Sequence, residues 1–191
     1  MSTHLKRTLD TPWFVWTLLS LPALGLTLEA LGPDAESGML LHVSGELSVR
    51  LLVLTLLVTP LSVVFSGRSW TRWLRRRRRW LGVASALYGL LHLAFYAGFD
   101  GILTDWSTPA ILTGWLALVA FIPPLVTSTD SAVRALGTRW KRVQQLTYVV
   151  VAGTVAHWVL LDGEVMPAVV HFAPWVGLRW WAAAVRDRQK R

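Results

Sequence analysis

Long apolar runs separated by short polar segments dominate this sequence, and they restrict the chain to a membrane-spanning fold. A helix needs about 20 apolar residues, at about 1.5 Å each, to cross the hydrocarbon core of a bilayer. Hydrophobic residues fill 53% of the 191 positions, with a mean hydropathy of +0.46, which is too apolar for an ordinary soluble domain. Runs of sufficient length occupy approximately residues 12–31, 47–65, 80–99, 109–126, 146–161 and 165–185.

We therefore predict an all-α integral membrane protein in which six transmembrane helices form one bundle. The spans and their short connections use the whole chain, so residues 1–191 are expected to form a single domain. Lys6 and Arg7 precede the first apolar run, as in a cleavable signal peptide. No clear small-residue cleavage site follows that run, so we expect it to be retained as a helix.

The charged residues divide the connections into two alternating classes. Lys and Arg gather before the first run, between the second and third, between the fourth and fifth, and after the sixth. The opposite connections carry mostly Asp and Glu. Because Lys and Arg in short loops stay on the cytoplasmic side of a membrane, both termini are predicted to be cytoplasmic.

The net charge of +8 has a second interpretation, which is binding to nucleic acid. The densest cluster is the arginine run at 75–79. No aromatic-interleaved basic surface or recognisable nucleic-acid fold accompanies this run. Membrane topology and contact with the lipid bilayer are therefore favoured over a nucleic-acid partner.

The residue types that are absent exclude several kinds of chemistry. Without any cysteine the chain cannot form disulfides, thiolate zinc sites or iron–sulfur clusters. It also lacks the Gly-x-Ser-x-Gly, phosphate-loop and dinucleotide-binding motifs, which argues against a self-contained hydrolase. Histidine, carboxylate and backbone groups remain as ligands.

Three histidines, His92, His157 and His171, are expected at one depth, roughly 6 to 11 Å from the outer surface at about 1.5 Å per residue. A neutral imidazole is a good iron ligand, and two imidazoles from facing helices can hold a haem iron from both sides. The alternatives are structural histidines that bond to neighbouring carbonyls, or a proton relay. A relay usually needs a carboxylate within the membrane, whereas every Asp and Glu is expected at an interface or in a loop.

Glycines are expected to make room for the ring of a haem beside its ligands. Gly89 lies three residues before His92, and Gly153 lies four residues before His157, so each is near the ligand face of its own helix. The other interpretation is that both glycines serve plain helix packing.

Other residues near these histidines have candidate roles in binding a cofactor. Tyr88 and Tyr96, four residues before and after His92, are expected to line the ring or to reach a propionate. His42 is expected at the outer interface, either contacting a propionate or a partner protein, or as a solvated loop residue. Arg50 either pairs with Glu46, four residues earlier, or neutralises a propionate.

Three segments of the sequence resemble the haem-binding membrane subunit of the bacterial periplasmic protein-methionine-sulfoxide reductase system, within the ferric-reductase-like transmembrane group. The segments are His42-Val-Ser-Gly45 followed by Leu54-Thr-Leu-Leu-Val-Thr-Pro60-Leu; Trp80-Leu-Gly82 followed by Leu91-His92-Leu-Ala-Phe-Tyr96; and Leu136-Gly-Thr-Arg-Trp140 followed by Tyr148 and Ala156-His157-Trp158. In order and spacing they cover about residues 40 to 160.

This resemblance implies a six-helix subunit of the bacterial inner membrane that binds one b-type haem. It implies electron transfer from the quinone pool or a cytoplasmic flavin reductase to a periplasmic molybdopterin subunit, which repairs oxidised proteins by reducing methionine sulfoxide. His92 and His157 match the family's haem-linked histidines and are the implied metal ligands. Flavin mononucleotide is a further cofactor of the family, although no motif of this chain is matched to it.

Two positions depart from the family pattern. Gln144 stands where relatives commonly have a histidine four residues after the loop tryptophan, so a second haem near it is not expected. His171 belongs to no family motif that we can name. It is either an alternative ligand or, as we favour, a residue behind the ligands.

We therefore expect an electron-transfer subunit of an oxidoreductase complex rather than its catalytic subunit. Haem iron changes by one electron whereas sulfoxide reduction needs two, so a partner must hold the substrate chemistry. One alternative is a stand-alone reductase of extracellular ferric or cupric ions, for which the chain lacks a flavin or nicotinamide domain. Another is a small transporter or assembly factor without haem.

Overall fold

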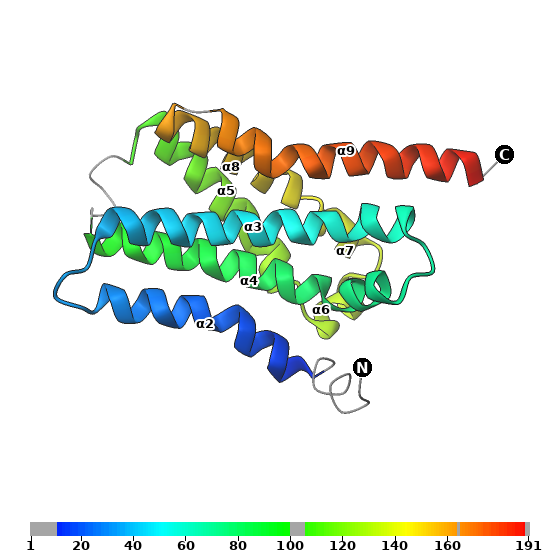
Figure 1. The fold of residues 1–191 in the computed structure, drawn as a ribbon, viewed down its shortest axis with the longest axis horizontal. Coiled ribbons are helices and arrows are strands. Elements are labelled where there is room, and N and C mark those ends of the chain that lie inside the picture. Colours follow the sequence, from blue (N-terminus) through cyan, green and yellow to red (C-terminus); the bar gives the residue numbers. More distant parts are fainter. Residues whose placement is uncertain (1–10, 100–105, 164, 190–191) are drawn as a thin grey trace.

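The computed structural model describes residues 11–99, 106–163 and 165–189, and this part of the chain is helical throughout, without strands (Figure 1). The long helices are α2 (Pro12–Ala30), α3 (Ser37–Val64), α4 (Ser69–Phe99), α5 (Pro109–Val126), α8 (Thr147–Asp162) and α9 (Met166–Gln189). Two short helices, α6 (Asp130–Leu136) and α7 (Arg139–Gln144), connect α5 to α8. The predicted all-α architecture is confirmed for the described residues.

Five helical segments of the described chain are long and apolar enough to cross a membrane: α2, α3, α4, α5 and the α7–α8 segment Arg139–Leu161. The sixth predicted run forms α9, but Arg179 interrupts its apolar sequence and α9 is not among these segments. A multi-pass membrane protein is thus supported, while the sixth crossing and the sidedness of the termini stay predictions. Lys6 and Arg7 lie outside the described residues.

α3 and α4 begin earlier than predicted, at Ser37 and Ser69 rather than near residues 47 and 80. Leu40 is completely buried in the core, so packing extends α3 toward its N-terminus. The arginine run is rich in good helix formers, which lets α4 continue through the basic connection. As a result Glu46 lies nine residues into α3, about 14 Å along its axis, and not in an outer loop.

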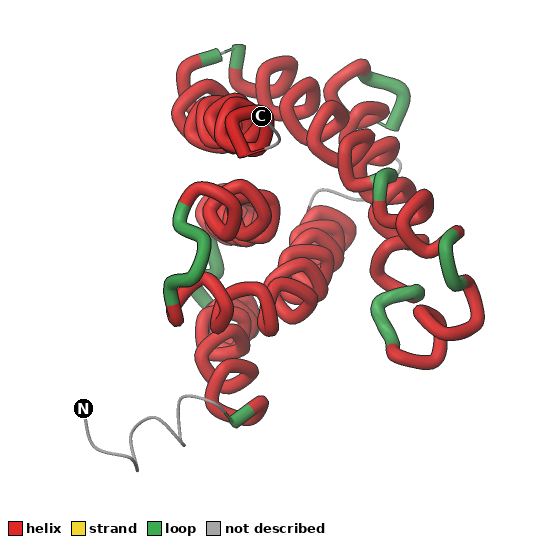
Figure 2. Tube along the Cα trace, turned by 90° about the vertical axis from the view of Figure 1, so that its right-hand side faces the viewer, coloured by secondary structure: helices red, strands yellow, loops and turns green. Residues whose placement is uncertain are grey.

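The helices pack as two pairs; Figure 2 shows the bundle turned by 90°, with several of its helices seen nearly end-on. α3 and α4 pack together along much of their lengths, and α5 packs on α8. Side chains of both pairs and of α9 meet in one buried core, which includes Leu52, Phe121 and Val150. α9 lies against α3, and α2 is only loosely attached to α3 and α4. Reciprocal hydrogen bonds join α3 to α4: Ser48 Oγ donates to the Ser85 carbonyl at 2.9 Å, and Ser85 Oγ donates to the Ser48 carbonyl at 2.8 Å. Bonds of this kind commonly connect helices in membranes.

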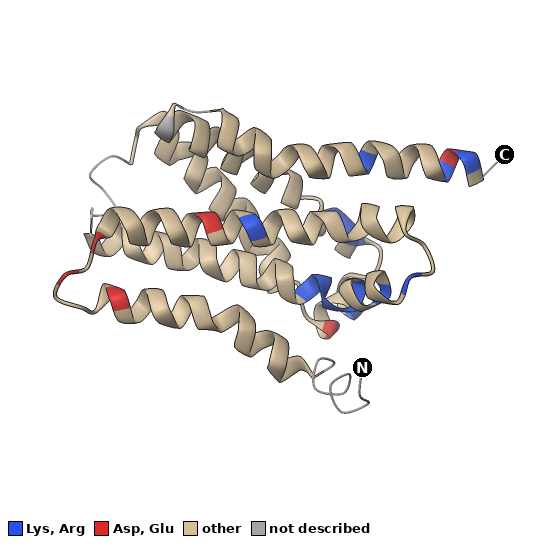
Figure 3. Cartoon of the chain, viewed as in Figure 1, with Lys and Arg blue, Asp and Glu red and all other residues tan. Residues whose placement is uncertain are grey.

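The charges separate along the bundle (Figure 3). The connection between α2 and α3 carries Asp34 and Glu36, and we call this the acidic end. The connection from α3 to α4, the first turns of α4, and the α6–α7 region carry most of the Lys and Arg, and we call this the basic end. This separation agrees with the charge alternation that underlies the predicted topology.

An ion pair joins α6 to α4 at the basic end. Arg79 Nη1 donates to Asp130 Oδ1, and this hydrogen bond and the nearby positive charge hold the pKa of Asp130 below its ordinary value of 3.8. A carboxyl group with a lowered pKa in the folded state stabilises the fold above its unfolded pKa. That contribution disappears as the pH falls through the folded value.

We expect Asp130→Asn to lower the melting temperature in detergent slightly at pH 7, by about 2 °C at most, because exposed ion pairs contribute little. The difference from the wild type should disappear as the pH falls below 3.8. Thermal unfolding from pH 7 to pH 3 measures this. A difference that is the same at both ends of the range would show that the charge of Asp130 is not responsible.

Candidate cofactor site between the helix pairs

A cavity of about 380 Å³ lies between α3, α4, α5 and α8, toward the acidic end of the bundle. Its walls are mainly apolar, and the polar groups that line it include His42, Glu46, Tyr96, His92 and His157. A mostly apolar cavity with a few placed polar groups is typical of cofactor and small-molecule sites.

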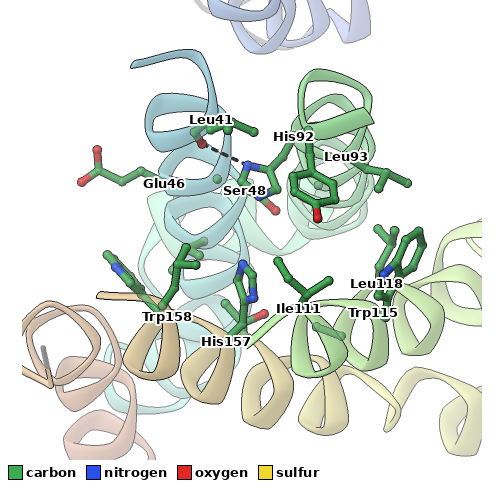
Figure 4. Close-up of a pocket in the computed structure, with 18 of the residues that line it drawn as sticks. Leu41, Glu46, Ser48, His92, Leu93, Ile111, Trp115, Leu118, His157 and Trp158 are labelled. Carbon is green, nitrogen blue, oxygen red and sulfur yellow. Dashed lines mark hydrogen bonds between the residues drawn. The ribbon is translucent and has the colours of Figure 1, made fainter. Parts of the chain in front are cut away.

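His92 of α4 and His157 of α8 turn their rings toward each other across this cavity (Figure 4). Their ring centroids are 6.3 Å apart and the ring planes are inclined by 83°. A metal–imidazole bond is about 2 Å long and the ring centroid lies about 1.2 Å behind the nitrogen, so two imidazoles on opposite sides of one metal ion have centroids about 6 Å apart. The observed separation therefore fits a single metal ion between the two rings.

A backbone carbonyl orients each of these rings. His92 Nδ1 lies 3.0 Å from the Leu41 carbonyl of α3, and His157 Nδ1 lies 2.7 Å from the Ala110 carbonyl of α5. Since a carbonyl oxygen only accepts hydrogen bonds, Nδ1 carries the proton and Nε2 keeps its lone pair. Histidines that bind metals are commonly held in this way, so both rings have the tautomer that a metal ion requires.

Two glycines let the rings approach these carbonyls. A Cβ atom on Gly114 would lie 2.9 Å from His157 Nδ1, and one on Gly45 would lie 3.2 Å from His92 Nδ1. Each glycine follows the residue with the accepting carbonyl by four positions, so it lies on nearly the same face of the helix, about one turn further along. Each glycine lies on the helix opposite its histidine, Gly45 on α3 and Gly114 on α5. No local sequence signal identifies Gly114.

The two glycines predicted from sequence have other surroundings. Gly89 lines the cavity, where a Cβ would make ordinary contact with Ser48 Oγ at 3.4 Å. A Cβ on Gly153 would lie 3.0 Å from Ala117 Cβ and from α5 backbone atoms. Gly153 therefore permits close packing of α8 on α5, the alternative that the sequence left open.

The two tyrosines near His92 separate in the structure. Tyr88 turns toward α2 and donates from its hydroxyl to the Leu19 carbonyl at 2.7 Å, so the expectation that it lines the same site is wrong. Tyr96 lines the cavity, and its buried hydroxyl has no hydrogen-bond partner within the described chain. A buried hydroxyl without a partner is costly, so a polar group of a bound cofactor fits this position.

A second polar group of residues surrounds Glu46. Arg50 Nη2 donates to Glu46 Oε1 at 2.6 Å, so Arg50 pairs with Glu46 and does not line the cavity. His42 Nε2 lies 4.0 Å from Glu46 Oε2, and His171 Nε2 lies 4.0 Å from Glu46 Oε1. His42 belongs to α3 and is not in a loop, although its side chain is 66% exposed.

His171 lies behind the cavity wall and not within the cavity. Its Nδ1 contacts the Pro167 carbonyl at 2.8 Å, and its ring packs against Trp158, with the centroids 5.1 Å apart. Trp158 itself lines the cavity. The structure thus brings together His92 and His157 as the facing pair and leaves His171 outside it.

The facing pair alone does not make a complete metal site. In residues 11–99, 106–163 and 165–189, no group of three or more His, Asp or Glu side chains is placed to hold a metal ion. An ion between His92 and His157 therefore needs further ligands from outside the protein. A porphyrin would supply such ligands, and His92 and His157 are the residues that would hold its metal ion.

Gln144 has a structural role in this fold. Its amide Nε2 donates to the Pro124 carbonyl and to Thr127 Oγ1, at 3.2 Å each, and the Trp140 indole donates to the Thr127 carbonyl at 3.0 Å. These bonds help to satisfy carbonyl groups at the end of α5, where the Pro124 carbonyl also accepts from Ser128 Oγ at 2.7 Å. The side chain at this position thus attaches α7 to α5.

Comparison with known proteins identifies the family of the chain. The model of the ferric reductase like transmembrane component matches residues 44–155. The protein-methionine-sulfoxide reductase heme-binding subunit MsrQ of Brucella ovis is 33% identical over 186 residues, which cover 90% of this chain and 81% of that protein. The chain belongs to the ferric-reductase-like transmembrane family, among the heme-binding subunits of protein-methionine-sulfoxide reductase.

A second relative and the range of the family match complete the comparison. The subunit of the same name from Brucella anthropi is 35% identical over 126 residues, covering 62% of this chain and 55% of that protein. The region matched by the family model contains His92 and ends two residues before His157. No solved structure matches the chain.

Proposed function

We propose that this chain is a membrane electron-transfer subunit that binds one b-type haem between His92 and His157. The observation that carries the proposal is the 6.3 Å separation of two rings whose Nδ1 atoms are both held by carbonyls. The mainly apolar walls suit a porphyrin ring, and Tyr96 offers a buried hydroxyl to one of its polar groups. The name of the relatives, heme-binding subunit, supports the same cofactor.

The proposed cofactor supplies reversible one-electron chemistry, and the protein supplies its position. His92 lies seven residues before the end of α4 at Phe99, which is about 10 Å along the helix. The site is therefore close to the acidic end, where a partner protein can approach. No side chain is proposed as catalytic, because the substrate chemistry belongs to that partner.

The relatives are named as subunits of protein-methionine-sulfoxide reductase, which supports a specific role in a complex. In this proposal the acidic end faces the periplasm and the basic end faces the cytoplasm of a bacterial inner membrane. Electrons come from a membrane quinone or a cytoplasmic flavin reductase. They leave to a periplasmic molybdopterin-containing subunit that reduces methionine sulfoxide. Flavin mononucleotide stays an expectation from the family, since none of the residues described above is matched to it.

The absorbance spectrum of the purified protein tests the haem proposal. We expect a Soret band, a low-spin spectrum typical of two histidine ligands, and about one haem per chain. Protein isolated with its full endogenous cofactor but without a Soret band would contradict the proposal and favour a transporter or assembly factor.

Reoxidation of the reduced protein distinguishes the proposed partner from the metalloreductase alternative. We expect the reduced haem to be reoxidised when the molybdopterin subunit and a methionine sulfoxide are added together, and not by ferric citrate. Fast reoxidation by ferric citrate, without the partner, would instead support a stand-alone metalloreductase.

A further inference from the structure

The two carbonyls that orient the facing histidines have a feature in common. Each also accepts a hydrogen bond from a hydroxyl group three residues further along its own helix. Ser44 Oγ donates to the Leu41 carbonyl at 3.2 Å, and Thr113 Oγ1 donates to the Ala110 carbonyl at 2.7 Å. These are the same carbonyls that the two facing rings contact through Nδ1. A hydroxyl donor and a ring donor therefore meet on one oxygen at both places.

The glycines that lie against the rings directly follow these hydroxyl residues. Ser44 precedes Gly45 in α3, and Thr113 precedes Gly114 in α5. Beside each ring, the facing helix thus presents the same three groups: a carbonyl, a hydroxyl three residues later and an unsubstituted Cα four residues later. We call this arrangement a ring seat. One seat is too short to be recognised in a sequence, and the structure identifies it because it occurs twice, each time opposite a histidine.

The third histidine of the predicted set provides a comparison. His171 Nδ1 also contacts a carbonyl, that of Pro167 in its own helix. The positions three and four residues after Pro167 are Val170 and His171 itself, so this carbonyl is followed by neither a hydroxyl nor a glycine there. The ring seat therefore accompanies the two rings that face the cavity and is not a general property of histidines that contact a carbonyl in this chain.

Hydroxyl groups that bond to a carbonyl of their own helix are common in membrane proteins and need no cofactor to explain them. Thr55 is an example in α3, where its hydroxyl donates to the Leu51 carbonyl at 2.8 Å. Ser44 differs, because its bond to the Leu41 carbonyl is longer and its Oγ also lies 3.3 Å from His92 Nδ1. Its side chain is completely buried. The hydroxyl of this seat thus lies between the carbonyl and the ring.

A second donor changes the position of a helix carbonyl. A carbonyl that accepts from a hydroxyl as well as from its helix N–H tilts away from the helix axis, and such bonds often bend the helix. The tilt turns the oxygen outward, toward a ring on the facing helix. A firm bond at Nδ1 fixes the ring and makes Nε2 a more basic ligand. Because a more basic ligand favours ferric over ferrous iron, hydroxyls at these positions strengthen haem binding and lower the reduction potential.

We propose that Ser44 and Thr113 are positioning residues for the haem ligands His92 and His157. Each hydroxyl holds a carbonyl toward its ring, so that the two imidazoles are firm and basic ligands. The inference rests on the proposed haem function and deepens it, because two residues that do not line the cavity take part in setting the potential of the haem. That potential determines how readily the subunit gives its electron to a partner.

Two measurements test the proposal: titration of the apoprotein with haem, and a redox titration of the haem-loaded protein. Thr113→Val removes a hydroxyl and keeps the shape of the side chain, and Ser44→Ala removes the other hydroxyl. We expect the haem affinity of each variant to fall about 3- to 10-fold, which is less than for loss of a whole orienting partner. We also expect ferrous haem to gain about threefold over ferric haem, which raises the potential by about 30 mV, at about 59 mV per factor of ten.

Two further variants are matched controls. Thr113→Ser keeps the hydroxyl, so it should have the haem affinity and the potential of the wild type. Thr55→Val removes a buried hydroxyl whose carbonyl partner, Leu51, contacts neither of the facing rings. It should leave the potential unchanged even if it lowers the melting temperature. Melting temperatures of all four variants separate a loss of stability from a change in potential.

The outcomes separate this inference from the haem proposal. A wild-type potential in either Ser44→Ala or Thr113→Val, with the haem retained, would overturn the inference and leave the haem site intact. An equal shift in Thr55→Val would also overturn it, because the ring seat would not be the cause. If Ser44→Ala does not fold, Thr113→Val and Thr113→Ser decide, and equal potentials in these two would contradict the inference. A wild type without haem would instead contradict the proposed function itself.

Discussion

Replacing His92 or His157 with alanine is expected to lower the haem content of the purified protein at least about tenfold, because each ring supplies one of the two protein ligands in the proposed site. The loss should be similar for the two variants, since each ring occupies one side of the same metal ion. Haem per protein, measured from the Soret absorbance and a pyridine extract, gives the result. His171→Ala is the matched control, and we expect it to keep its haem because His171 does not line the cavity.

A rescue experiment distinguishes loss of a ligand from loss of the fold. We expect His92→Gly and His157→Gly to regain haem when imidazole is supplied during expression, since free imidazole can occupy the space of the missing ring. Haem content that is unchanged in both alanine variants would exclude these histidines as ligands. If His171→Ala lost as much haem as the His92 and His157 variants, the haem site would have to lie closer to α9.

The second large effect is expected at Gly114, which lies against the ring of His157 at the cavity wall. In Gly114→Ala the new Cβ would lie 2.9 Å from Nδ1 and 3.1 Å from Cε1 of His157. The ring must then move, and its 2.7 Å bond to the Ala110 carbonyl breaks or lengthens. Loss of an orienting partner typically costs about 10- to 100-fold in metal affinity, so we expect a haem loss of that size.

The glycines of the chain provide a graded series for this measurement. Gly45→Ala should have a smaller effect than Gly114→Ala, since its Cβ would lie 3.2 Å from His92 Nδ1. Gly177→Ala in α9 meets nothing within 4 Å and should keep its haem, with stability unchanged or higher by about 0.5 to 1 kcal/mol. Equal haem content in all three variants, measured by titration of apoprotein with haem, would show that the glycines do not position the rings.

The positions of the helices could be predicted because hydrophobic length determines them. The predicted fourth span, residues 109–126, coincides with α5, since Pro109 marks its first turn and the apolar run ends at Val126. The predicted starts of α3 and α4 were wrong, because a helix continues beyond its apolar run wherever the residues favour helix formation and the chain can pack. Because α3 starts at Ser37, Glu46 lies in the bundle and not in a loop, which removes the argument against a proton relay.

The residues of the site were predictable only in part. Equal depth along three helices indicated His92 and His157, but the orienting carbonyls and Gly114 belong to facing helices, and a periodic pattern reports only on its own helix. Tyr88 and Tyr96 show a related limit. Four residues turn a helix by about 400°, so these side chains lie about 40° to either side of His92. One of them reaches the cavity and the other reaches α2.

The division of the bundle into the α3–α4 pair and the α5–α8 pair has a consequence for assembly. Within each pair, one helix carries the histidine and the other carries the carbonyl and the glycine that orient its ring. Each pair therefore forms half of the site without the other. The halves share a buried core with α9, and the proposed iron ligands come one from each half. Cofactor insertion would therefore add a further link between the two pairs, and a chain deprived of haem should be easier for a membrane protease to attack.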